Sequence, residues 1–146
     1  MSDLKPDWNL DLFYANNYIQ DLCFYKSSLV HSCCGFDARI RNVNAAFFDL
    51  ILRVLEDIDT AKIKHVAQVL IHLSKPSKQL DNDFRSREIN DSANALSAHF
   101  NRIRQNALCL ATKNSWHIQF SLPTTLPLVS IVIPTKDNKF LLQQCL

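Results

Sequence analysis

The sequence predicts an α/β fold class, and three observations predict it. Apolar residues recur over 47–58 with the three-to-four-residue period of a helix that is buried on most sides, and Asn44 is placed to cap its start. A second helical period runs over residues 85–111. Near the C-terminus, residues 129–133 (Val-Ser-Ile-Val-Ile) are nearly all apolar, which is typical of a strand that is buried on both faces of a parallel sheet. A polar loop and the amphipathic start Phe140-Leu141-Leu142 follow it, which is how a βαβ unit opens.

In the first half of the chain the local patterns predict a loop, a strand and a helix. Residues 5–11 read as an ordered loop, in which Trp8 either stacks on a sugar or base or closes the edge of a core. Residues 17–25 are rich in aromatic and apolar side chains and predict a short strand. Residues 26–33 predict a short helix, which Gly35 ends in the C′ position.

After the central helix the patterns predict two strands, a linker and a long helix. Residues 65–73 are rich in Val, Leu and Ile and favour a strand, and the polar residues 74–83 read as a linker. The long helix follows over 85–111, and residues 116–120 predict a short strand. The two prolines of residues 122–127 then predict a rigid, extended connector.

The long helix carries an apolar stripe with alternating spacings of four and three residues. Its members are Ile89, Ala93, Leu96, Phe100, Ile103, Ala107 and Leu110. Such a stripe packs on a neighbouring part of the fold or forms a dimeric coiled coil. The small side chains of Ala93 and Ala107 weaken the second interpretation.

Length and composition limit the classes of protein to which this chain can belong. The 146 residues suit one domain, and an apolar content of 47% is sufficient for a core. The formal net charge of +2 gives no electrostatic footprint for nucleic acid. No apolar run approaches the roughly 18–20 residues that span a bilayer, so no transmembrane segment is expected. The N-terminus does not resemble a signal peptide, and we expect a cytoplasmic location.

The numbers and positions of cysteine and glycine limit the kinds of binding site that the chain can form. The five cysteines form no C-x-x-C pair, which favours free thiols over a zinc site or a disulfide framework. They are Cys23, Cys33, Cys34, Cys109 and Cys145. Gly35 is the single glycine, which excludes a Gly-rich phosphate loop of the Rossmann or Walker type. Any nucleotide must therefore be held in another way.

The C-terminal residues VSIVIPTKDNKFLLQQCL resemble the opening strand, loop and helix of the family 2 glycosyltransferases, which use nucleotide sugars and have the GT-A fold. In that family the Pro-Thr end of the first strand lies beside the nucleotide base. The resemblance therefore implies nucleotide-sugar contacts for Pro134 and Thr135, and more weakly for Asp137.

The first half of the chain resembles the closing half of such a domain. Family members carry a Gly-Phe turn, a loop with the catalytic base ahead of an Asp-Leu…Leu-Arg helix, and a His-x-x-x-Val-Leu-x-His strand. The counterparts here are Gly35-Phe36, Asp49-Leu50…Leu52-Arg53, and His65…Val69-Leu70…His72. Their order and spacing fit the tandem family 2 glycosyltransferases that build bacterial surface polysaccharides of the O-antigen type.

The resemblance implies an incomplete GT-A fold, nucleotide-diphospho-sugar transferase-like, with a long connector helix. Residues 1–74 correspond to the acceptor-side C-terminal half of one domain. Residues 75–127 correspond to a linker with the long helix and a short strand, and residues 128–146 to the first strand and helix of a second domain. The chain is then expected to be a slice of a tandem enzyme. In the parent family the partners are a nucleotide-sugar donor and a glycan acceptor, at the cytoplasmic face of the inner membrane.

The chemistry of that family is only partly represented here. Sugar transfer needs a divalent cation, Mg²⁺ or Mn²⁺ in this family, to balance the charge on the departing diphosphate. It also needs a carboxylate to take the proton of the acceptor hydroxyl. Where family members place Gln-Asp or Glu-Asp, residues 44–48 read Asn-Ala-Ala-Phe-Phe, and the front half with the Asp-x-Asp metal motif is absent. We therefore expect a chain that binds no cofactor and cannot transfer sugar alone.

A few residues remain candidates for contacts with the acceptor. Trp8 and Asn17 are the first of these, with Asn16 and Tyr18 beside them. Asp49 could replace the missing base, although a carboxylate just inside a helix start usually serves the helix dipole.

Metal-ligand candidates are weaker. His72 matches the position where many family members place a third metal ligand, although a lone His at a strand end is more often structural. The triplets Asp57-Ile58-Asp59 and Asp81-Asn82-Asp83 are interpreted as decoys, because the family's motif precedes everything in this chain.

A protein of another class fits the sequence as an alternative. In that case the chain is a non-catalytic interaction module, and the apolar stripe over 89–110 docks a partner or a second copy. A nucleic-acid surface on the same helix is disfavoured, because acidic residues interleave with its arginines.

Overall fold

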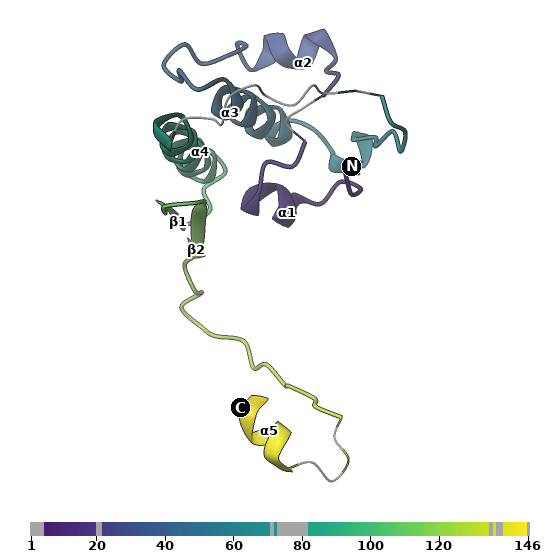
Figure 1. Ribbon diagram of the computed structural model, residues 1–146, viewed down its shortest axis with the longest axis vertical. Helices are drawn as coiled ribbons and strands as arrows, with labels where there is room; N and C mark the ends of the chain where they lie inside the picture. The colour runs from purple at the N-terminus through teal and green to yellow at the C-terminus, as the bar shows by residue number, and fades with distance from the viewer. Residues whose placement is uncertain are drawn as a thin grey trace.

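The computed structural model describes residues 5–19, 22–70, 72, 82–134, 136 and 139–145 (Figure 1). In chain order its elements are α1 (Leu10–Ala15), α2 (Ser27–Ser32), α3 (Val43–Glu56), the 3₁₀ turn η1 (Thr60–Lys62), α4 (Asn82–Arg102), β1 (Ala107–Ala111), β2 (Trp116–Phe120) and α5 (Lys139–Cys145). The fold is broadly α/β, a mixture of helices and one small antiparallel sheet. Among the described residues, no helix is long and apolar enough to cross a membrane.

The described residues of 5–120, here called the body, pack around α3 and α4, which lie side by side (Figure 1). The core is built by side chains of α1, α3 and α4, and its largest fully buried members are Phe13, Phe48, Leu50, Leu52, Leu96 and Phe100. The ring of Phe48 links three elements, since its centroid lies 4.9 Å from that of Phe13 and 5.4 Å from that of Trp116. The prediction of a central helix buried on most sides is confirmed.

The cap of α3 is Asn42 and not Asn44, so that prediction was wrong. The Asn42 side-chain oxygen accepts hydrogen bonds from the N–H groups of Asn44 and Ala45 at 3.0 and 3.1 Å. The side chain of Asn44 instead donates to Glu88 on α4 at 2.9 Å. The predicted cap therefore lies inside the first turn and ties α3 to α4.

A short helix, α1, begins within the predicted loop over 5–11. Asn9 caps it, because its side-chain oxygen accepts from the N–H of Leu12 at 2.8 Å. The helix buries Phe13 and Tyr14, which is what holds so short an element in place.

The predicted helix over 26–33 is confirmed as α2, but its end differs by one residue. Cys34 occupies the C′ position, and its N–H donates to the carbonyl of His31 at 3.1 Å. Gly35 follows, and its N–H donates to Val30 at 2.9 Å, which completes a Schellman motif. Both residues are left-handed, with φ of 60° and 68°, so Cys34 takes the place expected for the glycine.

The predicted long helix over 85–111 begins earlier and ends earlier, as α4. Arg104 adopts φ of 57°, and the N–H of Gln105 donates to Phe100, so the chain leaves the helix there. Ala107 and Leu110 of the predicted stripe lie in β1 instead. The stripe residues within α4 are buried inside this chain (Ile89, Ala93, Leu96 and Phe100). Within α4 the stripe therefore presents no free face for the coiled coil or partner that the sequence allowed. Ile103 and Leu110, beyond the helix, are 39% and 46% exposed.

Only one of the predicted strands forms among the described residues. β2 has the predicted bounds and pairs antiparallel with β1, with Ala107 opposite Phe120 and Ala111 opposite Trp116. The described residues of 17–25 and 65–73 form turns and irregular chain, so those two predictions were wrong. A strand needs a neighbour to pair its backbone groups, which local composition does not supply.

The described residues of 121–145, here called the tail, extend away from the body (Figure 1). The connector over 122–127 has no helix or strand, as predicted. The predicted buried strand over 129–133 is wrong for this chain, since these residues are irregular and Val132 is 88% exposed. α5 confirms the helix predicted after the polar loop.

Candidate functional site

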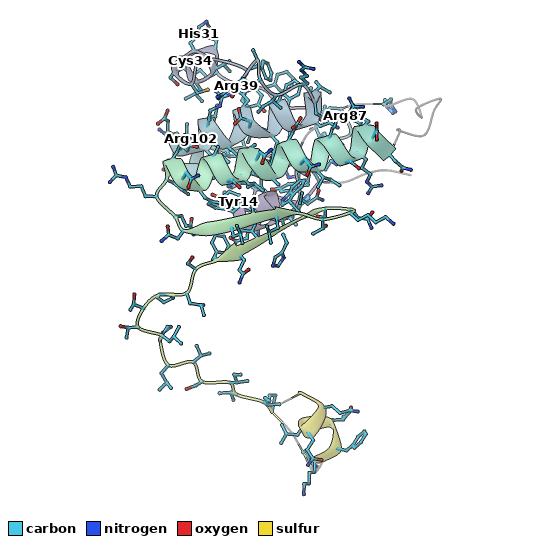
Figure 2. The ribbon with its side chains drawn as sticks, turned by 90° about the vertical axis from the view of Figure 1, so that its left-hand side faces the viewer. Tyr14, His31, Cys34, Arg39, Arg87 and Arg102 are labelled. Atoms are coloured by element: carbon cyan, nitrogen blue, oxygen red, sulfur yellow. The ribbon has the colours of Figure 1, made fainter. Side chains whose placement is uncertain are left out.

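A cleft of about 600 Å³ opens between the loop that follows α2 and the helices α3 and α4. The loop contributes residues 34–40, α3 contributes Asp49 and Arg53, and α4 contributes one face that includes Asp91 and Arg102. Cys34, Arg39 and Arg102 are labelled around it in Figure 2. Two motifs that carry the resemblance, Gly35-Phe36 and Asp49…Arg53, thus line the same hollow.

A largely buried ion pair forms part of the wall of this cleft. The side chains of Asp49 and Arg53 are only 6% and 16% exposed, and Arg53 Nη2 lies 2.7 Å from Asp49 Oδ2. Arg53 Nε donates to the same oxygen at 2.9 Å, and Nη1 donates to the backbone carbonyl of Cys33. This clamp fastens the end of α2 to α3. Asp49 therefore acts as the structural partner of Arg53, and its burial argues against the role of a substitute base.

The rim of the cleft is shaped by a second, exposed ion pair. Arg39 donates to the Asp37 carboxylate from Nε at 3.0 Å and from Nη2 at 2.7 Å. The Arg39 backbone N–H adds a bond of 2.9 Å. These side-chain and backbone hydrogen bonds from Arg39 lower the pKa of Asp37 to about 2. Because Arg39 is 89% exposed, the pair shapes the loop more than it stabilises the fold.

Three further side chains line the cleft and take no part in these ion pairs. Phe36 is 52% exposed, and its ring is held edge-on at 5.0 Å from the ring of Phe47. Asp91 is half-buried and has no hydrogen bond or ion pair with any described residue. Asn94 is exposed on the next turn of α4. A ring, a carboxylate and an amide are therefore open to a ligand.

A buried hydrogen-bond chain runs through the core and ends at the cleft. Tyr14 Oη lies 2.9 Å from His99 Nε2, and His99 Nδ1 lies 2.7 Å from Glu56 Oε1. Arg102, which lines the cleft, donates from Nε to the same carboxylate oxygen at 2.9 Å. Tyr14 and Arg102, the two ends of the chain, are labelled in Figure 2.

The pKa shifts of His99 and Glu56 give the protonation states within this hydrogen-bond chain. Burial lowers the pKa of His99, although the hydrogen bond and charge of Glu56 act in the opposite direction. The neutral imidazole then donates from Nδ1 to Glu56 and accepts the Tyr14 hydroxyl at Nε2. For Glu56, burial raises the pKa, but the hydrogen bonds from Arg102 and His99 together outweigh it and lower the pKa.

Of the predicted acceptor-side residues, Asp49 lines the cleft, while Trp8, Asn16, Asn17 and Tyr18 lie outside its lining. Trp8 packs on Phe13 with ring centroids 5.3 Å apart, so its core-edge interpretation holds. The Tyr18 hydroxyl accepts from the N–H of Asn9 at 2.9 Å, and Asn17 is 9% exposed. Asn16 is the C-cap of α1. Trp8, Asn17 and Tyr18 are thus part of the packed N-terminal segment, whereas the Asn16 side chain is exposed.

The predicted nucleotide and metal residues are only partly among the described residues. Pro134 is exposed in the tail, while Thr135 and Asp137 lie outside the described residues. His72 is exposed, and within the described ranges no three His, Cys, Asp or Glu side chains converge as metal ligands. Of the triplets read as decoys, one has structural roles, since Asp57 is the C-cap of α3 and Asp59 caps η1. The other triplet begins at Asp81, which lies outside the described residues.

Sequence reasoning identified the core-facing stripe of α4 and overlooked the face that lines the cleft. That face comprises Asp91, Asn94, Ala98 and Arg102, whose spacing of three and four residues places them on one side of a helix. The same spacing was visible in the sequence. The buried chain from Tyr14 to Glu56 had no such signal, because its members come from three helices far apart in the sequence.

Comparison with known proteins gives one relative of note. The chain is 30% identical over 139 residues to the uncharacterized protein y4gI of Sinorhizobium fredii (strain NBRC 101917 / NGR234). The match covers 92% of this chain and 15% of that protein, so the chain spans less than a sixth of the relative's length. No protein-family profile matches the sequence. No solved structure matches it either.

Proposed function

We propose that the chain belongs to a family 2 glycosyltransferase type of polypeptide that acts in bacterial polysaccharide synthesis. The body derives from the acceptor-side half of one GT-A domain and its connector, and residues 128–146 open a second domain. The observation that carries the proposal is the convergence of Gly35-Phe36 and Asp49…Arg53 on one cleft. The hydrogen bond from Arg53 to Cys33 gives a physical reason for their spacing, because it joins the turn to the helix.

The proposed chain does not transfer sugar by itself. The segment at the position of the family's catalytic base contributes Ala45, Ala46 and Phe48, which are buried and apolar. The described residues offer no converging set of ligands for the family's Mg²⁺ or Mn²⁺. The cation and the base are therefore assigned to other parts of the proposed polypeptide, while Pro134, Thr135 and Asp137 remain the proposed nucleotide-sugar contacts of this chain.

The tail supports the second half of the proposal. Val129, Ile131 and Ile133 alternate with Leu128 and Val132, so apolar side chains lie on both faces of an extended chain. All of them are exposed here, and Leu128 is 97% exposed. A strand that is apolar on both faces fits the interior of a parallel sheet with helices on both sides. α5, which follows it, fits one of those helices.

The test is an assay of nucleoside diphosphate release from UDP-, GDP- and dTDP-sugars with Mn²⁺. It compares the 146-residue chain with the full-length relative from Sinorhizobium fredii. The proposal predicts release by the relative, loss of that release with EDTA, and none by the chain alone. Release by the chain alone, or failure of the relative with every donor, would contradict it.

A non-catalytic interaction module remains a second candidate, because the tail exposes a run of apolar side chains. Its contact element is the tail rather than the predicted stripe over 89–110, whose members within α4 are buried by the body. Multi-angle light scattering over a range of concentrations tests self-association through this element. A mass that rises with concentration favours the module, and a fixed monomer mass counts against self-association.

A further inference from the structure

We propose that the cleft between the loop 34–40 and α4 binds a saccharide. The inference rests on the proposed function and deepens it, by assigning a ligand class to the junction between the half-domain that carries the resemblance and the connector helix α4, which the resemblance leaves without a role. One wall of the cleft is α4, which belongs to the connector, and the other is the loop of the preceding half-domain. The site therefore exists only where the two parts pack together.

The charges in the cleft disfavour a phosphate or another anion. Each guanidinium that lines it already has a carboxylate partner in the chain. Arg53 pairs with Asp49, Arg39 with Asp37, and Arg102 with Glu56. At Arg53 or Arg102 an anion would have to displace a carboxylate, and at every position in the cleft the half-buried Asp91 would repel it. The charge pattern points to a ligand that carries no net charge.

The groups left open are those that recognise hydroxyl groups. The Asp91 carboxylate accepts hydrogen bonds only, whereas the Asn94 amide both donates and accepts. Arg39 keeps further N–H groups beyond those that reach Asp37, and its side chain is 89% exposed. Adjacent hydroxyls of a sugar ring can donate to Asp91 and accept from Asn94 or Arg39 at the same time. An apolar ligand would leave these groups without partners.

The apolar groups of the cleft suit the other side of a sugar ring. Phe36 presents an aromatic face, on which the C–H groups of a pyranose can stack, and Phe47 fixes its orientation. Ala95 and Ala98 give α4 a low surface between Asp91 and Arg102, so a ring can approach the helix closely. A volume of about 600 Å³ is within the range of small-molecule sites.

The experiment is saturation-transfer-difference NMR on the 146-residue chain. The probes are methyl glycosides of glucose, galactose, mannose, rhamnose and N-acetylglucosamine. Phe36→Ala and Asp91→Asn are compared with the controls Phe24→Ala and Asp57→Asn, which replace exposed residues outside the cleft lining. We expect a signal from at least one glycoside, and dissociation constants about tenfold larger for the two cleft variants, the scale of one lost hydrogen bond or stacking contact. The controls should bind like the parent chain.

Asp91→Asn keeps the size of the side chain, so a loss of binding in this variant does not arise from a change in packing. Circular dichroism checks that all four variants are folded. No signal with any probe would overturn the proposal, as would a signal that the cleft variants leave unchanged. Binding and turnover are separate readouts. If the glycoside binds in the cleft while the full-length relative releases no nucleoside diphosphate, the saccharide site stands and the glycosyltransferase proposal falls.

Discussion

The body and the tail are both rich in apolar residues, yet only the body buries them. In α3 and α4 the apolar side chains repeat with the helical period, so each helix places a stripe against the other. In the tail, residues 129–133 are apolar on both faces of an extended chain, and among the described residues no sheet receives them. An amphipathic helix needs one partner, whereas such a strand needs neighbours at both edges and cover on both faces.

The largest expected difference between the two regions is in the cost of removing an apolar side chain. Phe48 is fully buried against Phe13 and Trp116, so Phe48→Ala should lower the free energy of unfolding by about 3–5 kcal/mol. Val132 is 88% exposed, so Val132→Ala should change it by less than about 0.5 kcal/mol. Urea unfolding followed by tryptophan fluorescence measures both. Equal losses would mean that the tail packs on the body.

The buried ion pair Asp49–Arg53 and the exposed ion pair Asp37–Arg39 should differ in their contribution to the stability of the body. Arg53→Ala leaves the buried Asp49 carboxylate without its partner and releases the end of α2. It should cost about 3 kcal/mol, the lower end for a buried pair, because Arg53 retains some exposure. Arg39→Ala removes the exposed pair and should leave the unfolding midpoint nearly unchanged. A midpoint for Arg53→Ala that equals that of Arg39→Ala would show that the clamp is not structural.

The buried chain at His99 predicts a pH dependence that the tail does not share. The folded pKa of His99 lies below its ordinary value of 6.5, so the unfolded chain takes up the proton first as the pH falls. Its contribution to stability is therefore complete above about pH 6.5 and is lost as the pH falls below that value. Glu56, whose folded pKa is also lowered from 4.5, adds a further loss in more acidic solution.

Urea unfolding from about pH 8 to about pH 5 measures this slope. His99→Gln should flatten it, whereas His117→Gln, which replaces an exposed residue on β2, should not. An unchanged slope in His99→Gln would assign the pH dependence to other groups.

The smallest expected effect on stability comes from deleting residues 122–146. The deleted segment buries little of the body, so the free energy of unfolding should stay the same while solubility rises. Thermal denaturation and the protein concentration that remains after centrifugation measure the two quantities. If the remaining residues unfold, the tail is an integral part of the body and the interpretation of 128–146 as the opening of another domain is wrong.

Periodic elements could be predicted from the sequence because their signal is local. The bounds of β2, the burial of α3 and the existence of α2 and α5 all follow from patterns of a few residues. The end of α4 could not be predicted in this way, because the apolar spacing continues through Ile103, Ala107 and Leu110. The left-handed Arg104 and the pairing of β1 with β2 decide it, and both depend on tertiary structure.

The false strands and the missed part of the cleft have a common cause. Residues 17–25 and 65–73 have the composition of strands, but composition does not provide a neighbouring strand. Asp49 was identified as a candidate, but its pairing with Arg53 and burial beside Cys33 required the fold. Asp91 was interpreted only as one of the acidic residues that interleave with the arginines of the long helix, because an acidic residue on a polar helix face is ordinary until the opposite wall of a cleft is known.

Hydrogen exchange of backbone amides, resolved by peptide, tests the contrast between body and tail most directly. Amides in the centres of α3 and α4 should exchange only through global unfolding, because these helices hold the core. Amides of residues 129–133 should exchange as fast as those of an unstructured peptide, since they lie in exposed, irregular chain. Slow exchange at 129–133 in the isolated chain would contradict an unpartnered strand and show that these residues already pair.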